Sequence, residues 1–137
     1  MKTEDELLYL VAKTHTHGNI NYIKDFLAEN VIWCNENIEL PAIGKENACA
    51  KIWHWFLYNS NFNVWVDAIM HSAEEGSMGY VSLANDYDDI HVCIVIELED
   101  GLITRYYEVK PDNTGRRLFQ TLKKNVLEPR IAKATEQ

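Results

Sequence analysis

The fold is decided by one stretch of this chain, residues 91–109, which reads HVCIVIELEDGLITRYYEV. In it, two runs rich in Ile, Val and Tyr are joined by Asp100 and Gly101. An Asp-Gly pair is typical of a two-residue type I′ turn, because both central positions need a positive φ that Asp tolerates and Gly adopts freely. The stretch therefore predicts an antiparallel β-hairpin with its turn at these two residues.

The turn also predicts the register of the two strands, because a fixed loop length fixes which residues lie opposite one another. The predicted pairs are Leu98 with Ile103, Ile96 with Arg105, Ile94 with Tyr107, Glu97 with Thr104, Val95 with Tyr106 and Cys93 with Glu108. One face of the predicted hairpin is almost purely apolar, and the other mixes apolar residues with a carboxylate, a thiol and a phenol. Neither face is therefore expected to lie against bulk water. Glu108 is thus predicted to face Cys93.

The other predicted elements follow from hydrophobic periodicity and from helix caps. Thr3 and Glu6 form a capping-box pattern ahead of an apolar stripe, which predicts a first helix ending near Gly18. The periodicity further predicts a short helix over 19–30, a strand over 31–36 and, after a break at Pro41 and Gly44, a helix over 45–60. Two strands over 63–75 and 78–86 are then expected to pair Met70 with Val81 and Ala68 with Leu83, followed by an acidic turn over 86–89. A closing helix over 116–137 is expected to be stopped or kinked by Pro129. This order predicts an α+β fold with helices packed on one face of a curved antiparallel sheet.

Length and composition restrict the class of protein. The 137 residues predict one domain, 1–137, with a core over 1–112 and a C-terminal helical extension over 113–137. No apolar run approaches the roughly 20 residues of a membrane span, and a net charge of −8 disfavours nucleic acid as a partner. An acidic N-terminus without a signal-peptide pattern and three cysteines at spacings that fit no disulfide framework predict a cytoplasmic protein.

Three stretches resemble the nuclear-transport-factor-2-like superfamily, which includes SnoaL-like polyketide cyclases, ketosteroid isomerases and limonene-epoxide-hydrolase-like proteins. They are GNINYIKDFLAENVIWC from residue 18, GKENACAKIWHWF from residue 44 and VCIVIELEDGLITRYYEV from residue 92. The resemblance implies a cone, in which three helices of the N-terminal half cover the concave face of a curved antiparallel sheet and leave an apolar cavity open at the wide end. It also implies a homodimer formed through the sheet.

The resemblance can be carried to single residues for two of these chemistries. The general base of ketosteroid isomerases aligns with Asn35, which cannot take up a proton at neutral pH, and their oxyanion-hole residues align with Val11 and with Cys93 or Ile94. The buried aspartate of limonene-epoxide-hydrolase-like enzymes aligns with Glu108, whereas their arginine and aspartate fall near Asn85 and Asp86, so that set is incomplete.

Glu108 is therefore the candidate catalytic residue, because a carboxylate in the middle of a buried strand must be hydrogen-bonded or protonated. The candidate substrate-binding residues are the aromatic walls and polar groups expected beside it, namely Trp33, Asn35, Trp55, Tyr80, Cys93 and Tyr106. A solvated or salt-bridged role for Glu108 and plain core packing for the aromatic residues are the competing interpretations. No metal site and no cofactor are expected, since His15 and His17 are two apart on a helix and do not face together.

These observations lead to two hypotheses. In the first, a cytoplasmic dimer binds a small hydrophobic or amphipathic molecule in an aromatic cavity and is an isomerase, lyase or hydrolase acting through Glu108. In the second, a non-catalytic dimeric interaction or structural domain fills its cavity with its own side chains. A pocket of at least ~300 Å³ with Glu108 at its wall favours the first, and a plugged cone with Glu108 in solvent favours the second.

Overall fold

The computed structural model describes residues 2–58, 64–71, 78–85, 92–113 and 116–136. Their order is α1 (Glu4–His17), η1 (Ile20–Tyr22), η2 (Lys24–Phe26), β1 (Leu27–Asn35), β2 (Ile38–Ile43), α2 (Lys45–Tyr58), β3 (Val64–His71), β4 (Met78–Asn85), β5 (Val92–Glu99), β6 (Leu102–Val109), η3 (Pro111–Asn113), α3 (Arg116–Leu122), η4 (Lys123–Leu127) and α4 (Glu128–Thr135). The predicted α+β class is confirmed. Within the described residues, no helix combines the length and the apolar character needed to cross a membrane.

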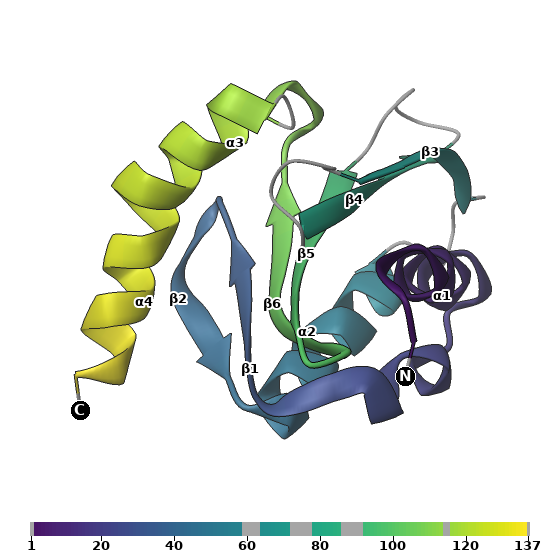
Figure 1. The fold of residues 1–137 in the computed structure, drawn as a ribbon, viewed down its shortest axis with the longest axis horizontal. Coiled ribbons are helices and arrows are strands. Elements are labelled where there is room, and N and C mark those ends of the chain that lie inside the picture. Colours follow the sequence, from purple (N-terminus) through teal and green to yellow (C-terminus); the bar gives the residue numbers. More distant parts are fainter. Residues whose placement is uncertain (1, 59–63, 72–77, 86–91, 114–115, 137) are drawn as a thin grey trace.

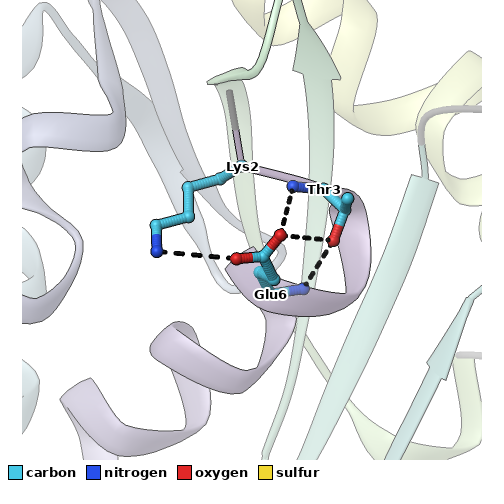
Figure 2. Close-up of polar contacts among 3 residues, drawn as sticks. All are labelled: Lys2, Thr3 and Glu6. Atoms are coloured by element: carbon cyan, nitrogen blue, oxygen red, sulfur yellow. Dashed lines mark hydrogen bonds and ion pairs between the residues drawn. The ribbon is translucent and has the colours of Figure 1, made fainter.

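Helix α1 begins where the capping box predicts. Figure 2 shows the reciprocal contacts: the Thr3 hydroxyl accepts from the Glu6 amide at 3.2 Å, and the Thr3 amide donates to the Glu6 carboxylate at 3.2 Å. The helix ends at Gly18, whose φ of 61° is the left-handed conformation favoured by glycine. Its Leu7, Leu8 and Val11 are fully buried, so α1 is fixed both at its start and along its apolar face.

The helix predicted over 19–30 is wrong. Two short 3₁₀ turns, η1 and η2, stand in its place, and β1 already begins at Leu27. Asn19 accepts a hydrogen bond from the Asn21 amide at 3.0 Å, which closes a tight turn rather than an α-helical one. Pairing of Leu27 with Ile103 of β6 then recruits the end of the stretch into the sheet, so tertiary contact overrides local helix propensity.

Strand β2 is absent from the sequence-based expectation, which treated Pro41 as a break. The structure places Pro41 inside β2, paired antiparallel to β1. The strand order is β2-β1-β6-β5-β4-β3, so β2 lies at one edge of the six-stranded sheet. An edge strand tolerates proline because one row of its backbone groups needs no partner strand.

The sheet is antiparallel apart from one parallel pair, β1 with β6. The expected wholly antiparallel sheet is therefore corrected to a mixed one, because β1 enters the sheet between β2 and β6. This parallel pair sets Trp33 beside Tyr106 and Asn35 beside Glu108.

The central hairpin keeps its predicted turn but not its full register. Asp100 and Gly101 have φ of 54° and 77°, and Leu98 pairs with Ile103 as expected. A bulge then shifts the register by one residue, so Glu108 lies opposite Ile94, and Cys93 lies opposite Val109. Since a one-residue slip moves side chains to the other face, the predicted meeting of Glu108 with Cys93 is wrong.

The hairpin of β3 and β4 also differs from its predicted register. The predicted two-residue turn falls between His71 and Met78, outside the described residues. Val81 pairs with Ile69 rather than Met70, a shift of one residue. A bulge between Val66 and Ala68 shifts the register by one more, so that Leu83 pairs with Val66 rather than Ala68. The predicted acidic turn at 86–89 lies outside the described residues.

The two faces of the sheet carry different layers. On one face α1 packs on β3 and β4 while α2 packs on β1 and β2, enclosing the larger apolar core. Figure 1 shows β3 and β4 running across the direction of β1 and β6, so the sheet bends around these helices. On the opposite face the C-terminal helix covers β1, β5 and β6 through a second cluster, made of Ile32, Cys34, Cys93, Val95, Tyr107, Val109, Phe119, Leu127 and Ile131.

The C-terminal helix runs on through Pro129 and is not stopped there. A π-helical segment, η4, precedes Pro129, which stands in the first turn of α4, where its missing N–H leaves no hydrogen bond broken. Arg130 then donates to the carbonyl oxygens of Glu36 at 2.9 Å and Ile38 at 3.3 Å. These hydrogen bonds join the C-terminal helix to the β1–β2 turn and so hold Asn35 in place.

Candidate functional site

Glu108 lies on the face of β6 that is turned toward α1 and α2, and its side chain is 4% exposed. Its Oε1 accepts a hydrogen bond from the indole N–H of Trp33 at 2.9 Å, and its Oε2 accepts one from the side-chain amide of Asn35 at 3.1 Å. Both donors come from β1, the parallel neighbour of β6. The buried carboxyl group is therefore held at both oxygens, which excludes the solvated interpretation of Glu108.

Both neighbours of Glu108 can only donate. An indole N–H has no acceptor function. The amide of Asn35 is held in one orientation, because its Oδ1 accepts from the backbone N–H of Asn37 at 2.8 Å and so its Nδ2 must face Glu108. The two donors therefore stabilise the ionised carboxylate of Glu108. The protonated carboxyl group is held less well, because neither Trp33 nor Asn35 can accept a hydrogen bond from its O–H there.

Burial raises the pKa of Glu108 to about 7, since a charge removed from water is costly. The hydrogen bonds from Trp33 and Asn35 and the nearby charge of Lys51 lower the pKa and offset part of this effect. Both protonation states of Glu108 are consequently populated near neutral pH, as an acid–base catalyst requires.

A pocket of about 640 Å³ opens above Glu108. Its walls come from the ends of β1 and β6, the turn into β2, the start of β5 and the last two turns of α2; the lining residues are Trp33, Asn35, Asn37, Ile38, Lys51, His54, Trp55, Tyr58, Val92 and Glu108. Four of the predicted site residues, Trp33, Asn35, Trp55 and Glu108, are therefore brought together at one pocket.

Sequence reasoning missed the rest of the α2 wall. Lys51, His54, Trp55 and Tyr58 are spaced three and four residues apart, the spacing of neighbours on one helix face. Although α2 is broadly apolar, it is not covered on all sides, since Trp53 is 52% and Tyr58 75% exposed. Lys51 and His54, two polar residues at this spacing on an otherwise apolar helix, were the sequence signal that this face of α2 lines a pocket.

Tyr106 does not line the pocket, contrary to the prediction. It is fully buried in the core, where its hydroxyl bonds Nε2 of His15 from α1. The imidazole ring contacts Trp55 edge-on with centroids 4.5 Å apart, and burial lowers the pKa of His15 to about 3. Burial, and then the charge of Glu108, raise the pKa of Tyr106 well above its ordinary value. This pair fills the interior behind the pocket, and sequence patterns gave no signal for it.

One further predicted residue, Cys93, is not brought to the site. Cys93 lies on the opposite face of the sheet, in the cluster beneath the C-terminal helix, with its sulfur 3.4 Å from the Ser82 hydroxyl. The bulge in the central hairpin is the reason, because it reverses the face of Cys93 relative to Glu108. The side chain of Tyr80 lies outside the described part of the structure, as does Asp86.

The described pocket holds one carboxyl group, one ammonium group, one imidazole and three large aromatic rings. Across the described ranges, no three His, Cys, Asp or Glu side chains come together as a metal site. The chemistry available from these residues is proton transfer by Glu108 beside aromatic surface.

Comparison with known proteins places the fold. No family model matches the sequence, and no curated protein matches it. Solved structures do match. A candidate ketosteroid isomerase from Kribbella flavida has a TM-score of 0.60 at 17% identity, over 78% of this chain and 78% of its own. An NTF2-like protein of unknown function from Cytophaga hutchinsonii has a TM-score of 0.55 at 16% identity, over 79% of this chain and 89% of its own.

A candidate polyketide cyclase from Pseudomonas putida matches with a TM-score of 0.54 at 16% identity, over 79% of this chain and 91% of its own. Similarity at this level of identity concerns the path of the backbone and not the activity. Together with the order of strands and the helices on one face of the sheet, it confirms the fold that the three sequence stretches implied. The chain has the nuclear-transport-factor-2-like fold.

Proposed function

We propose that the pocket binds a small apolar or amphipathic molecule and that Glu108 transfers a proton to and from it. One observation carries the proposal: a single carboxyl group lies buried at the pocket wall, held by two groups that can only donate. A carboxyl group with a pKa of about 7 can serve as base or as acid at neutral pH.

The substrate would lie against Trp55 and Tyr58, whose rings offer flat apolar surface, while Trp33, which is 2% exposed, holds Glu108 at the pocket wall. The volume of about 640 Å³ exceeds the roughly 300 Å³ expected of a small-molecule site. The pocket wall combines aromatic and aliphatic side chains with five polar or charged ones, so apolar contact would supply affinity and the polar groups would orient the substrate.

The reaction class that the residues favour is a one-base proton shift, as in an isomerisation or an elimination. Glu108 would remove a proton as the carboxylate, with its orientation kept by Trp33 and Asn35, and would return that proton to another atom as the acid. Hydrolysis is less well supported, because Glu108 is the one carboxyl group among the described lining residues and water activation commonly uses a second acid or a metal. Two structural neighbours, a candidate ketosteroid isomerase and a candidate polyketide cyclase, are consistent with proton chemistry in this fold.

The proposal is tested with the Trp33 indole N–H as the reporter, because it donates directly to Glu108. In ¹⁵N-edited NMR spectra its resonance is expected to titrate with a midpoint near pH 7 in the wild type and not to titrate in Glu108→Gln. A thermal-shift screen of apolar metabolites is then run on both proteins. A midpoint near the ordinary glutamate pKa, or a screen without a single stabilising compound, would contradict the proposal.

A second candidate function has one observation in its favour. His15, Trp55 and Tyr106 fill the interior behind the pocket, as the hypothesis of a non-catalytic domain with a filled cavity requires. The homodimer expected from the sequence remains a proposal under both functions. Since the C-terminal helix covers the outer face of β1, β5 and β6, a dimer would have to use other surface. Sedimentation equilibrium measures the oligomeric state directly.

A further inference from the structure

Lys51 lies where two hollows of the molecule meet. It lines the pocket above Glu108, and it also lines a second hollow of about 660 Å³ between β2, α2 and α4. The second hollow is walled mostly by small and apolar residues of these elements, among them Leu40, Pro41, Ala42, Ile43, Ala50 and Ala134. Lys51 thus belongs to the walls of both hollows.

The charges around this junction are mostly positive. Lys51, Arg130 and Lys133 line the second hollow against a single acid, Glu39. The chain as a whole carries a net charge of −8, so a local excess of cations inside a hollow is contrary to its general character. Hollows lined by one sign of charge concentrate the field and attract ions of the opposite sign.

Lys51 itself is held by an aromatic ring and not by an acid. Its Nζ lies 5.5 Å from the centroid of the Trp33 ring, a cation–π arrangement. Within residues 2–58, 64–71, 78–85, 92–113 and 116–136, no carboxylate forms an ion pair with it. Its side chain is exposed, so the ammonium group keeps its charge available at the mouth of the pocket.

We infer that the ligand of the pocket is an organic anion, whose apolar ring lies against Trp55 and Tyr58 and whose anionic group binds the ammonium of Lys51. This inference rests on the proposed function and names its substrate class. A cationic ligand fits less well, because Lys51 already occupies the face of Trp33 and would repel a second positive charge. A neutral ligand would form no ion contact with Lys51.

Three probes of nearly equal shape separate these cases: phenylacetate as the anion, phenylacetamide as the neutral compound and phenethylamine as the cation. Each is titrated near pH 7.5 into ¹⁵N-labelled protein, and shifts of the Trp33 indole N–H give the dissociation constant. Phenylacetate is expected to bind in the millimolar range, at least about tenfold more tightly than phenylacetamide, and to weaken as salt is added, because an ion contact near the surface is screened.

Variants of Lys51 test whether this residue causes the preference for phenylacetate over phenylacetamide. Lys51→Met keeps most of the side-chain length and should remove the tenfold preference, whereas Lys51→Arg should retain it. Lys124→Met, an exposed lysine on the C-terminal helix, removes the same charge elsewhere and should leave the preference unchanged. Equal binding of phenylacetate and phenylacetamide, tighter binding of phenethylamine, or a preference that survives Lys51→Met overturns the inference. Binding of phenylacetamide at the Trp33 signal would still support the proposed pocket, and a midpoint near pH 7 for that signal would support the proton-transfer role independently.

Discussion

The indole N–H of Trp33 donates a 2.9 Å hydrogen bond to Oε1 of Glu108, although the two residues are 75 positions apart in the chain. The bond joins adjacent strands β1 and β6 and connects the wall of the pocket to its ionisable group. A hydrogen bond to a charged group contributes about 1.5–3 kcal/mol, so this contact controls both the stability of the site and the protonation of Glu108.

Trp33→Phe should raise the pKa of Glu108 further, because the carboxylate loses a donor while it stays buried. The variant should also lose about 2–3 kcal/mol of unfolding free energy near pH 8, from the lost hydrogen bond and the smaller ring, and less near pH 5, where Glu108 is protonated. The pKa is measured from the ¹³C shift of the Glu108 carboxyl group. Trp65→Phe is the matched control, since Trp65 is 45% exposed; an equal loss in both variants would contradict the assignment.

Glu108→Gln should change how stability depends on pH. The pKa of Glu108 is raised from 4.5 to about 7 on folding, so the folded state holds the proton more tightly than the unfolded state between these values. The wild type therefore loses stability as the pH rises through this window, by at most about 3 kcal/mol, and Glu108→Gln removes this loss. Glutamine brings its own cost at every pH, because one of the fixed donors must then face an NH₂ group. Denaturant unfolding at several pH values separates the slope from this constant cost.

His15 should act with the opposite sign. Burial lowers its pKa from 6.5 to about 3, so its contribution to stability is complete above pH 6.5 and is lost as the pH falls toward 3. His15→Phe should flatten the acid limb of the stability profile, while His17→Gln, on the exposed end of the same helix, should not. An unchanged acid limb in His15→Phe would mean that the imidazole is not buried in its neutral form.

His15 and Tyr106 should also show coupling. Removal of either one leaves a buried polar group without its partner and is expected to cost about 1–3 kcal/mol. The double variant His15→Phe with Tyr106→Phe removes both groups, so it should cost less than the sum of the single variants, by about 1 kcal/mol or more. Strict additivity in urea unfolding would show that the hydrogen bond contributes nothing.

Asn35→Asp should couple the titrations of two neighbouring carboxyl groups. The new carboxylate would face Oε2 of Glu108, where the amide now donates at 3.1 Å, and two adjacent carboxylates cannot both ionise without cost. The variant should therefore lose stability steeply above pH 7 and bind one shared proton below it. Asn37→Asp is the control, because the backbone N–H of Asn37, and not its side chain, contacts Asn35. Similar pH profiles for the two variants would argue against the fixed amide orientation.

Local signals predicted much of the fold. The Asp100-Gly101 turn and the capping box of Thr3 and Glu6 were identified from sequence, because each is specified by residues close together in the chain. Strand β2 was missed because Pro41 indicates a break unless the strand is known to lie at an edge, which is a property of the whole sheet. The helix expected over 19–30 failed for a similar reason, since pairing with β6 decides the state of Leu27 onward.

Glu108 and three of its neighbours were predicted from sequence, whereas the other residues of the pocket wall were missed. Glu108, Trp33, Asn35 and Trp55 were named from strand position and resemblance, and the structure brings all four to one pocket. Cys93 was misplaced because the bulge of the central hairpin has no sequence signature. The His15–Tyr106 contact depends on how α1 packs against the sheet, and pairwise packing of distant elements cannot be read from one sequence.

The parallel pairing of β1 with β6 builds the site from segments that lie far apart in the chain. A chain cut between α2 and β3 would yield one fragment with Trp33, Asn35 and Lys51 and another with Glu108. Neither fragment alone could produce a titrating indole signal. Mixing the two would restore that signal only through reassociation of the halves, so fragment complementation reports the assembly of the site and of the sheet in one measurement.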